Sequence, residues 1–135
     1  MLNRHGFTLM EIIITVIIIS VLLAVAIPNY IRTVEAAKCS HAMKILTAIH
    51  DAAYDYFADN NTFAGALTDL EDYVGANFYS TANSNPDWTF SYAGAAATFT
   101  ATATRRSGPF SGTAITLTQD DVWGGGYPRD NPTNF

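Results

Sequence analysis

The chain has 135 residues, of which 49% are hydrophobic, and a formal net charge of −5 at pH 7 with a sequence pI near 4.8. This length allows one domain in addition to a long apolar segment, but not two sizeable cores. An acidic chain argues against nucleic-acid binding, because phosphate contacts need clustered lysine and arginine, and Arg105-Arg106 is the only adjacent basic pair. The single cysteine, Cys39, cannot form an intramolecular disulfide, and we expect it to be a small packing residue.

A long apolar stretch lies near the N-terminus. From Phe7 to Ile27 there are 21 residues, and only Glu11 among them has a charged side chain. A helix of this length spans about 32 Å, close to the thickness of a bilayer core. It could be a secretory signal cleaved after Ala26, or a plain membrane anchor with Arg4 on the cytoplasmic side. Neither interpretation explains Glu11, because a carboxylate at the centre of a bilayer helix costs about 2.5–3.5 kcal/mol and is expected to have a partner.

Gly6 followed by Phe7-Thr8-Leu9-Met10-Glu11 resembles the processing site of type IV prepilins and the related pseudopilins. The resemblance implies that a prepilin peptidase cuts between Gly6 and Phe7 and that the new N-terminal Phe7 is N-methylated. It also implies that Glu11 neutralises the N-terminus of the adjacent subunit in a filament. The amine of its own Phe7, one helical turn away, is the other plausible partner.

Pro28 stands at the helix-bending proline of that family. Proline removes a helical N–H and crowds the preceding turn, so we expect a bend or local melting there. The resemblance then divides the chain into a leader peptide (1–6), a transmembrane or filament-core helix (7–28), and an amphipathic half-helix followed by a globular head (29–135).

The helix is expected to resume after Pro28 with apolar residues at three- and four-residue steps, which predicts an amphipathic helix packed against a domain. The apolar positions are Ile31, Val34, Ala42, Ile45, Leu46, Ile49, Ala53 and Tyr56. Asp59 to Thr62 should end it, since Asn and Asp compete with helical backbone bonds. Thr68 and Glu71 form a possible capping box for a short helix that follows.

The period then changes from helical to alternating. Trp88 to Tyr92 and Ala97 to Thr104 alternate large or small apolar residues with Thr and Ser, which predicts an antiparallel hairpin with one packed face. Ile115 and Leu117 predict a third strand, and the tail from Asp120 to Phe135 should be mostly irregular. The expected fold class is α+β: the pilin fold, in which a long N-terminal helix packs on a small antiparallel sheet of about three to four strands.

No catalytic constellation stands out, so we expect neither an enzyme nor a cofactor. His41 and His50 are nine residues apart, which is not the spacing of a metal-binding pair on a helix, and both are expected to be solvated or hydrogen-bonded. Asp120, Asp121 and Asp130 are the calcium candidates, but their spacing is not that of an EF-hand, and a solvated acidic turn without metal is the expectation.

These patterns predict a structural subunit of a type IV pilus-like filament. The implied partners are copies of the same chain, other pilins, a prepilin peptidase and methyltransferase, and an assembly platform in the inner membrane; nucleic acid is not expected. Before assembly the chain would span the inner membrane once, with its N-terminus cytoplasmic, and afterwards lie in an extracellular filament. Two alternatives remain: a type II secretion pseudopilin, and a soluble binding protein secreted after cleavage at Ala26.

Overall fold

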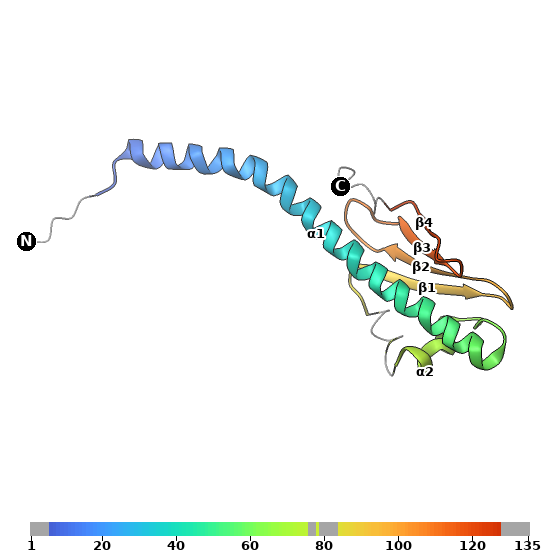
Figure 1. Cartoon of the computed structure of the whole chain (residues 1–135). Helices are drawn as coiled ribbons and strands as arrows, with labels where there is room; N and C mark the ends of the chain where they lie inside the picture. Colours follow the sequence, from blue (N-terminus) through green and yellow to red (C-terminus); the bar gives the residue numbers. More distant parts are fainter. Residues whose placement is uncertain (1–5, 76–77, 79–83, 128–135) are drawn as a thin grey trace, which may run out of the picture.

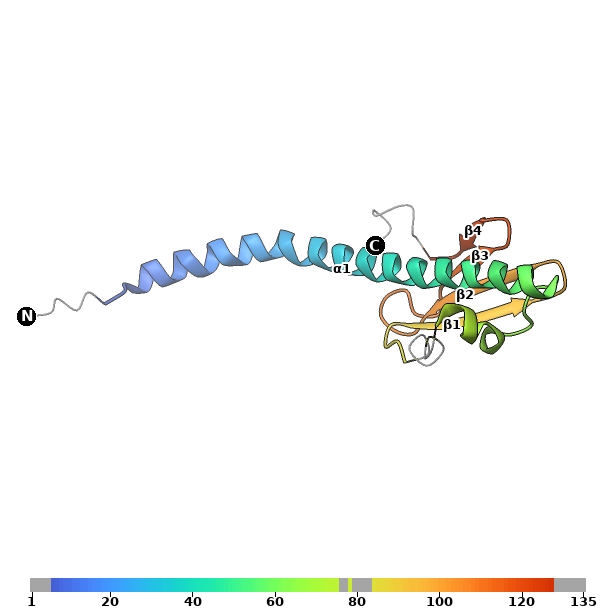
Figure 2. The ribbon, with the colours of Figure 1, turned by 60° about the horizontal axis from the view of Figure 1, so that its bottom comes forward.

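The computed structural model describes residues 6–75, 78 and 84–127. A long helix, α1, is followed by a short 3₁₀ helix, η1, a short helix, α2, and four strands, β1 to β4. Figure 1 shows the C-terminal half of α1 lying across the sheet while the N-terminal half extends away from it. The same arrangement is visible from a second direction in Figure 2. The predicted α+β pilin fold is therefore confirmed.

Helix α1 runs from Leu9 to Asn60, 52 residues in all, and is about 78 Å long at roughly 1.5 Å per residue. It begins two residues later than predicted, because Thr8 has an extended backbone and caps the helix by accepting a hydrogen bond from the Glu11 N–H at 3.3 Å. It ends where the sequence predicts. Asn61 has a left-handed backbone (φ 54°), and its N–H donates to the Phe57 carbonyl.

Pro28 lies inside α1 and does not interrupt it. The local melting expected at this position is absent, and in Figure 1 the helix curves smoothly through the region. One missing N–H removes a single backbone bond from a helix that continues for many turns on both sides. The N-terminal and C-terminal halves of α1 are therefore one continuous rod.

Burial begins abruptly along this rod. From Leu9 to Thr33 every residue of α1 is exposed, whereas from Glu35 onward the buried positions recur at three- and four-residue steps. The buried stripe thus starts at Glu35, not at Ile31, which is 49% exposed. Cys39 is buried among apolar neighbours, as predicted for a packing residue. We call the part of the molecule from Glu35 to Tyr127 the head.

The sheet is an antiparallel meander in the order β1-β2-β3-β4. Its strands are β1 (Trp88–Gly94), β2 (Phe99–Arg105), β3 (Ala114–Thr118) and β4 (Trp123–Gly125). Buried and more exposed residues alternate along β1, β2 and β3, so one face packs on α1. The second strand begins at Phe99 and not at Ala97, because the turn before it is closed by the Ala95 N–H donating to Thr98 O.

The described part of the C-terminal tail, residues 120–127, is more ordered than predicted. Strand β4 pairs with β3, and Tyr127 beyond it is 5% exposed. Gly125 has a φ of +103°, and a Cβ there would overlap the Ala114 carbonyl, so only glycine suits this close approach. A glycine-rich stretch that reads as irregular from its sequence therefore forms the edge of the sheet.

Helices η1 (Leu67–Leu70) and α2 (Glu71–Val74) cover the far end of the head. The predicted capping box of Thr68 and Glu71 is wrong. The carboxylate of Asp69 instead accepts hydrogen bonds from the Gly65 and Ala66 N–H groups, at 3.2 and 3.0 Å. The capped N–H groups thus belong to residues 65 and 66, just before η1, and not to the start of α2 as the sequence pattern predicts.

Candidate functional site

The first part of the site is the apolar segment, residues 7–27, of which residues 9–27 belong to α1. It carries fifteen large apolar side chains between 46% and 79% exposed. Among the described residues, α1 is the one helix that is long and apolar enough to cross a membrane, and its most apolar stretch has no buried residue. Leaving these side chains in water would cost on the order of 20 kcal/mol, at about 1.5–3 kcal/mol for each fully buried one. The segment therefore needs a non-aqueous environment, supplied by lipid or by other apolar helices.

Glu11 is the polar exception in this segment. The hydroxyl of Thr15 donates to the Ile12 carbonyl at 2.8 Å, and that of Ser20 donates to the Val16 carbonyl at 2.7 Å, so both are satisfied within the helix. The Glu11 carboxylate has no ion-pair partner within the described chain. In an apolar environment its charge thus requires a cation from outside the described residues of this chain.

The structure brings Gly6, Phe7 and Glu11 together at one end of the molecule. Phe7 lies before the Thr8 cap, outside the helix, and is 79% exposed. The same-face spacing of Phe7 and Glu11 assumed a helical Phe7, and that condition is not met here. Pro28 lies 17 residues from Glu11, about 26 Å along the helix axis at roughly 1.5 Å per residue. Pro28 therefore lies within the continuous helix and is not part of the cluster formed by Gly6, Phe7 and Glu11.

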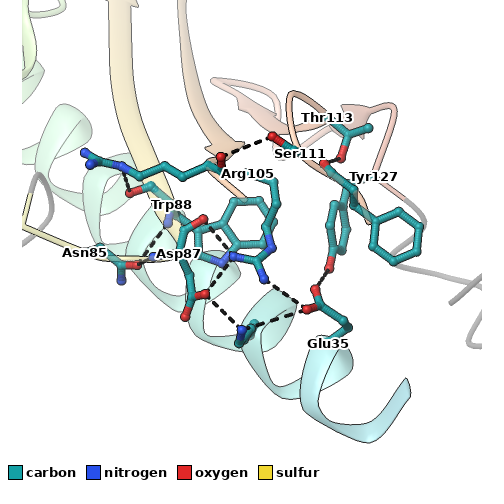
Figure 3. Close-up of polar contacts among 11 residues, drawn as sticks. Glu35, Asn85, Asp87, Trp88, Arg105, Ser111, Thr113 and Tyr127 are labelled. Atoms are coloured by element: carbon teal, nitrogen blue, oxygen red, sulfur yellow. Dashed lines mark hydrogen bonds and ion pairs between the residues drawn. The ribbon is translucent and has the colours of Figure 1, made fainter. Parts of the chain in front are cut away.

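The second part of the site is a buried ion network that the sequence analysis missed. We define it as Glu35, Lys38, Asp87, Arg105 and Tyr127. Figure 3 labels Glu35, Asp87, Arg105 and Tyr127. Arg105, which is 2% exposed, donates from Nη2 to Glu35 Oε1 at 2.9 Å and from Nη1 to Asp87 Oδ1 at 2.7 Å. Tyr127 donates to Glu35 Oε2 at 3.0 Å. Lys38 lies 2.9 Å from Asp87 Oδ1. The network ties the first buried turn of α1 to β1, β2 and the tail.

The charges in this network stabilise one another. Burial would raise the pKa of Asp87, but hydrogen bonds from Lys38 and Arg105 outweigh it and lower that pKa below its usual value. Burial would lower the pKa of Arg105, but Glu35 and Asp87 raise it. Burial and the hydrogen bond to Glu35 raise the pKa of Tyr127, which keeps its hydroxyl protonated as a donor. The guanidinium of Arg105 also lies over the Trp88 ring, 5.6 Å from its centroid.

Two sequence signals could have located this network. Glu35 lies seven residues before Ala42 and fourteen before Ile49, and therefore on the buried stripe of α1. Arg105 continues the inward alternation of Ala101 and Ala103 along β2. Both charged residues thus occupy positions where the pattern predicts an apolar side chain.

Two of the three calcium candidates, Asp120 and Asp121, lie within the described residues. Asp120 accepts a hydrogen bond from Gln119 Nε2, and Asp121 Oδ1 lies 3.6 Å from His50 Nε2; Asp130 is outside the described residues. Within the described ranges, no three residues of the types His, Cys, Asp and Glu are grouped so that they could hold a metal ion. His50 is 7% exposed, with Nδ1 3.5 Å from Asp51 Oδ1, while His41 is exposed. The two histidines therefore have different surroundings.

Family models match the chain from residue 1 to residue 115, which includes the apolar segment and all of the ion network except Tyr127. Residues 28–115 match the family model described as "Type IV minor pilin ComP, DNA uptake sequence receptor". Residues 1–27 match the model described as "Prokaryotic N-terminal methylation motif". No solved structure matches the chain significantly.

Three curated relatives show similar identities. The type IV major pilin protein PilA of Myxococcus xanthus is 39% identical over 68 residues, which are 50% of this chain and 31% of that protein. The type II secretion system core protein G of Escherichia coli is 33% identical over 74 residues, 55% of this chain and 51% of that protein. The fimbrial protein of Neisseria meningitidis is 35% identical over 74 residues, 50% of this chain and 44% of that protein. The chain thus spans about a third to a half of the length of these relatives.

Proposed function

The chain belongs to the type IV pilin family, within the group described as type IV minor pilin ComP, and we propose that it is a structural subunit of a type IV pilus-like filament. The observation that carries the proposal is the exposed apolar segment, whose one carboxylate, near its N-terminal end, has no ion-pair partner among the residues that the structure describes. Lipid acyl chains can cover fifteen apolar side chains, but they offer Glu11 no cation. A bundle of the same helices supplies both an apolar surface and, at each N-terminus, a positive amine.

Processing between Gly6 and Phe7 creates that amine. The N-terminal methylation motif over residues 1–27 supports a prepilin peptidase as the enzyme that cuts there, followed by N-methylation of Phe7. Because Phe7 lies before the helix cap, we propose that the amine of a neighbouring subunit, and not its own, neutralises Glu11. Pro28 would then ease the curvature of the rod as it packs in the filament core.

The same segment defines the proposed location. Residues 7–28 would span the inner membrane once before assembly, with Arg4 on the cytoplasmic side and residues 29–135 outside. An assembly platform in that membrane would transfer the helix from lipid into the filament, alongside other pilins. The proposed role is structural and involves no catalysis.

DNA reception, named in the description of the family model, is not part of this proposal. The described head has four lysine and arginine residues, and two of them already form ion pairs within it: Arg105 is buried on Glu35 and Asp87, and Lys38 pairs with Asp87. The expectation against nucleic-acid binding therefore stays a prediction. Salt-sensitive retention of duplex DNA on purified filaments would contradict it.

A type II secretion pseudopilin is the second candidate, favoured by the similarity to the core protein G of Escherichia coli. Both candidates use the same N-terminal chemistry. Electron microscopy of filaments sheared from the cell surface separates them, because a pseudopilus subunit at native expression should not be recovered in long surface fibres.

The central experiment is the intact mass of the chain in sheared filaments. We expect a chain that begins at Phe7 and carries one added methyl group. A chain that begins at Ile27 would instead identify a protein secreted by cleavage after Ala26. Absence of this polypeptide from sheared fibres, together with an uncut leader in the membrane, would refute the proposal.

The role of Glu11 is tested with Glu11→Val and the matched control Thr15→Val. The control also removes a polar group from the segment, but one that is satisfied within the helix. We expect both variants to insert into the membrane and only Glu11→Val to lose filaments. Normal filament yield from Glu11→Val would refute the role of the carboxylate.

A further inference from the structure

The charged side chains of the head are segregated along its long axis. We define the proximal end as residues 32–44 of α1, which begin just before the head, together with residues 87 and 105–106. The ion network holds Asp87 and Arg105 against this part of α1. The distal end is residues 51–60 of α1, helices η1 and α2, and residues 119–122 between β3 and β4. The distal parts are joined by the Tyr73 hydroxyl donating to Asp59 and the Tyr54 hydroxyl donating to Gln119 O. Figures 1 and 2 show α2 beside the far end of α1.

The two ends carry opposite formal charge. In the described proximal end, five cations and two carboxylates give +3, while the described distal end has eight carboxylates and no lysine or arginine, giving −8. The proximal cations are Arg32, Lys38, Lys44, Arg105 and Arg106, and the proximal carboxylates are Glu35 and Asp87. The distal carboxylates, all exposed, are Asp51, Asp55, Asp59, Asp69, Glu71, Asp72, Asp120 and Asp121. His41 in the proximal end and His50, just before the distal residues, are counted as neutral.

This distribution selects one kind of self-association. A two-fold dimer built on either end would place like charges together, and two distal ends of −8 would repel strongly. A head-to-tail contact brings unlike ends together, and head-to-tail contacts that do not close generate helical filaments. Parallel packing of the apolar segments in a filament would also align the heads in one direction. The two arrangements are therefore compatible.

We propose that the acidic distal end of each head docks on the basic proximal end of the next copy of this chain. The inference rests on the proposed filament function and adds a second, electrostatic contact outside the helical core. Lys44 is the proximal cation best suited to a test. It is exposed, lies outside the ion network, and is on the solvent side of α1.

The experiment compares three chains as sheared filaments. Lys44→Glu reduces the proximal charge to +1. The matched control, Ala58→Glu with Thr68→Glu, changes the net charge by the same −2 but places it on exposed distal positions. Filament disassembly is measured as the detergent concentration that releases half of the subunits, at low and at high NaCl. Salt screens charges over a Debye length of about 10 Å at 0.1 M and about 3 Å at 1 M, so both attraction and repulsion between ends should weaken.

The sign of the salt effect decides the outcome. For wild-type filaments and for the distal control, we expect high salt to lower the half-release concentration severalfold, because it screens an attraction. For Lys44→Glu we expect a lower half-release concentration at low salt and little or no salt effect. Equal behaviour of the two variants, or stabilisation of wild-type filaments by salt, would overturn the inference while leaving the filament proposal intact. Absence of the wild-type chain from filaments would instead overturn the proposed function, and this inference with it.

Discussion

Removing the Glu35 carboxylate should destabilise the head by about 3 kcal/mol. Glu35→Ala deprives the buried Arg105 of its bond at 2.9 Å and Tyr127 of its bond at 3.0 Å. Breaking a buried ion pair from one side costs about 3–5 kcal/mol. The lower end of that range applies, because Asp87 still accepts from Nη1 of Arg105. A matched control, Glu71→Ala, removes an exposed carboxylate and should change stability by no more than about 0.5 kcal/mol.

A double-mutant cycle with Tyr127→Phe isolates the hydrogen bond to Glu35. Tyr127→Phe alone should cost about 1.5 kcal/mol, the lower range for a hydrogen bond to a charged group. In the Glu35→Ala background most of that cost should disappear, since the accepting carboxylate is already gone. The expected coupling is therefore about 1 kcal/mol or more.

Chemical unfolding of the full chain in detergent micelles, followed by tryptophan fluorescence, provides the free energies of unfolding. Trp88 is a suitable reporter because its ring is fully buried, with the Tyr127 ring centroid at 5.0 Å. A loss below about 1 kcal/mol for Glu35→Ala, or strictly additive costs in the cycle, would refute the view that these contacts act as one network.

Three further predictions concern the head. Gly94→Ala should destabilise it by about 2 kcal/mol or more, because the added Cβ would overlap the backbone carbonyl of Ala64. In the control Gly65→Ala the added Cβ makes only ordinary contacts, so this variant should be tolerated. Thermal unfolding measures both. The lowered pKa of Asp87 means that its carboxylate stabilises the fold above its unfolded pKa of about 4. This stability is lost as the pH falls through the folded pKa. Asp87→Asn should therefore make the free energy of unfolding less dependent on pH in the acid range. Burial raises the pKa of Tyr92 to about 12. The stability that its neutral hydroxyl contributes is therefore complete below about pH 10, the unfolded pKa, and is lost as the pH rises towards 12. A fall of stability at alkaline pH that is unchanged by Tyr92→Phe would contradict this.

Local periodicity predicted most of the fold. The switch from three- and four-residue steps to two-residue alternation located α1 and the first three strands, because each of these elements buries one face. Strand β4 could not be predicted in this way. It is three residues long and contains Gly124 and Gly125, and its position depends on pairing with β3. Its signal is therefore tertiary and not local.

The two parts of the site differ for the same reason. The apolar segment is continuous in the sequence, so its composition is enough to predict an exposed membrane-length helix. The ion network joins Glu35 to Arg105 and Tyr127, which are 70 and 92 residues away along the chain. Spacing marks Glu35 and Arg105 as inward-facing, but only the assembled sheet shows that the two charges meet. A charged residue in phase with a buried stripe is thus a useful indicator of a distant partner.

The continuity of α1 links the two parts mechanically. Because Pro28 does not interrupt the helix, the direction in which the apolar segment leaves the head is set by the contacts of α1 from Glu35 onward. Glu11 lies 24 residues from Glu35, about 36 Å along the rod, so a tilt of about 10° at the network would displace the carboxylate by about 6 Å. A displacement of that size exceeds the length of an ion pair. Under the proposed function, the ionic bonds that hold α1 on the sheet should therefore also influence whether Glu11 can reach the amine of a neighbouring subunit.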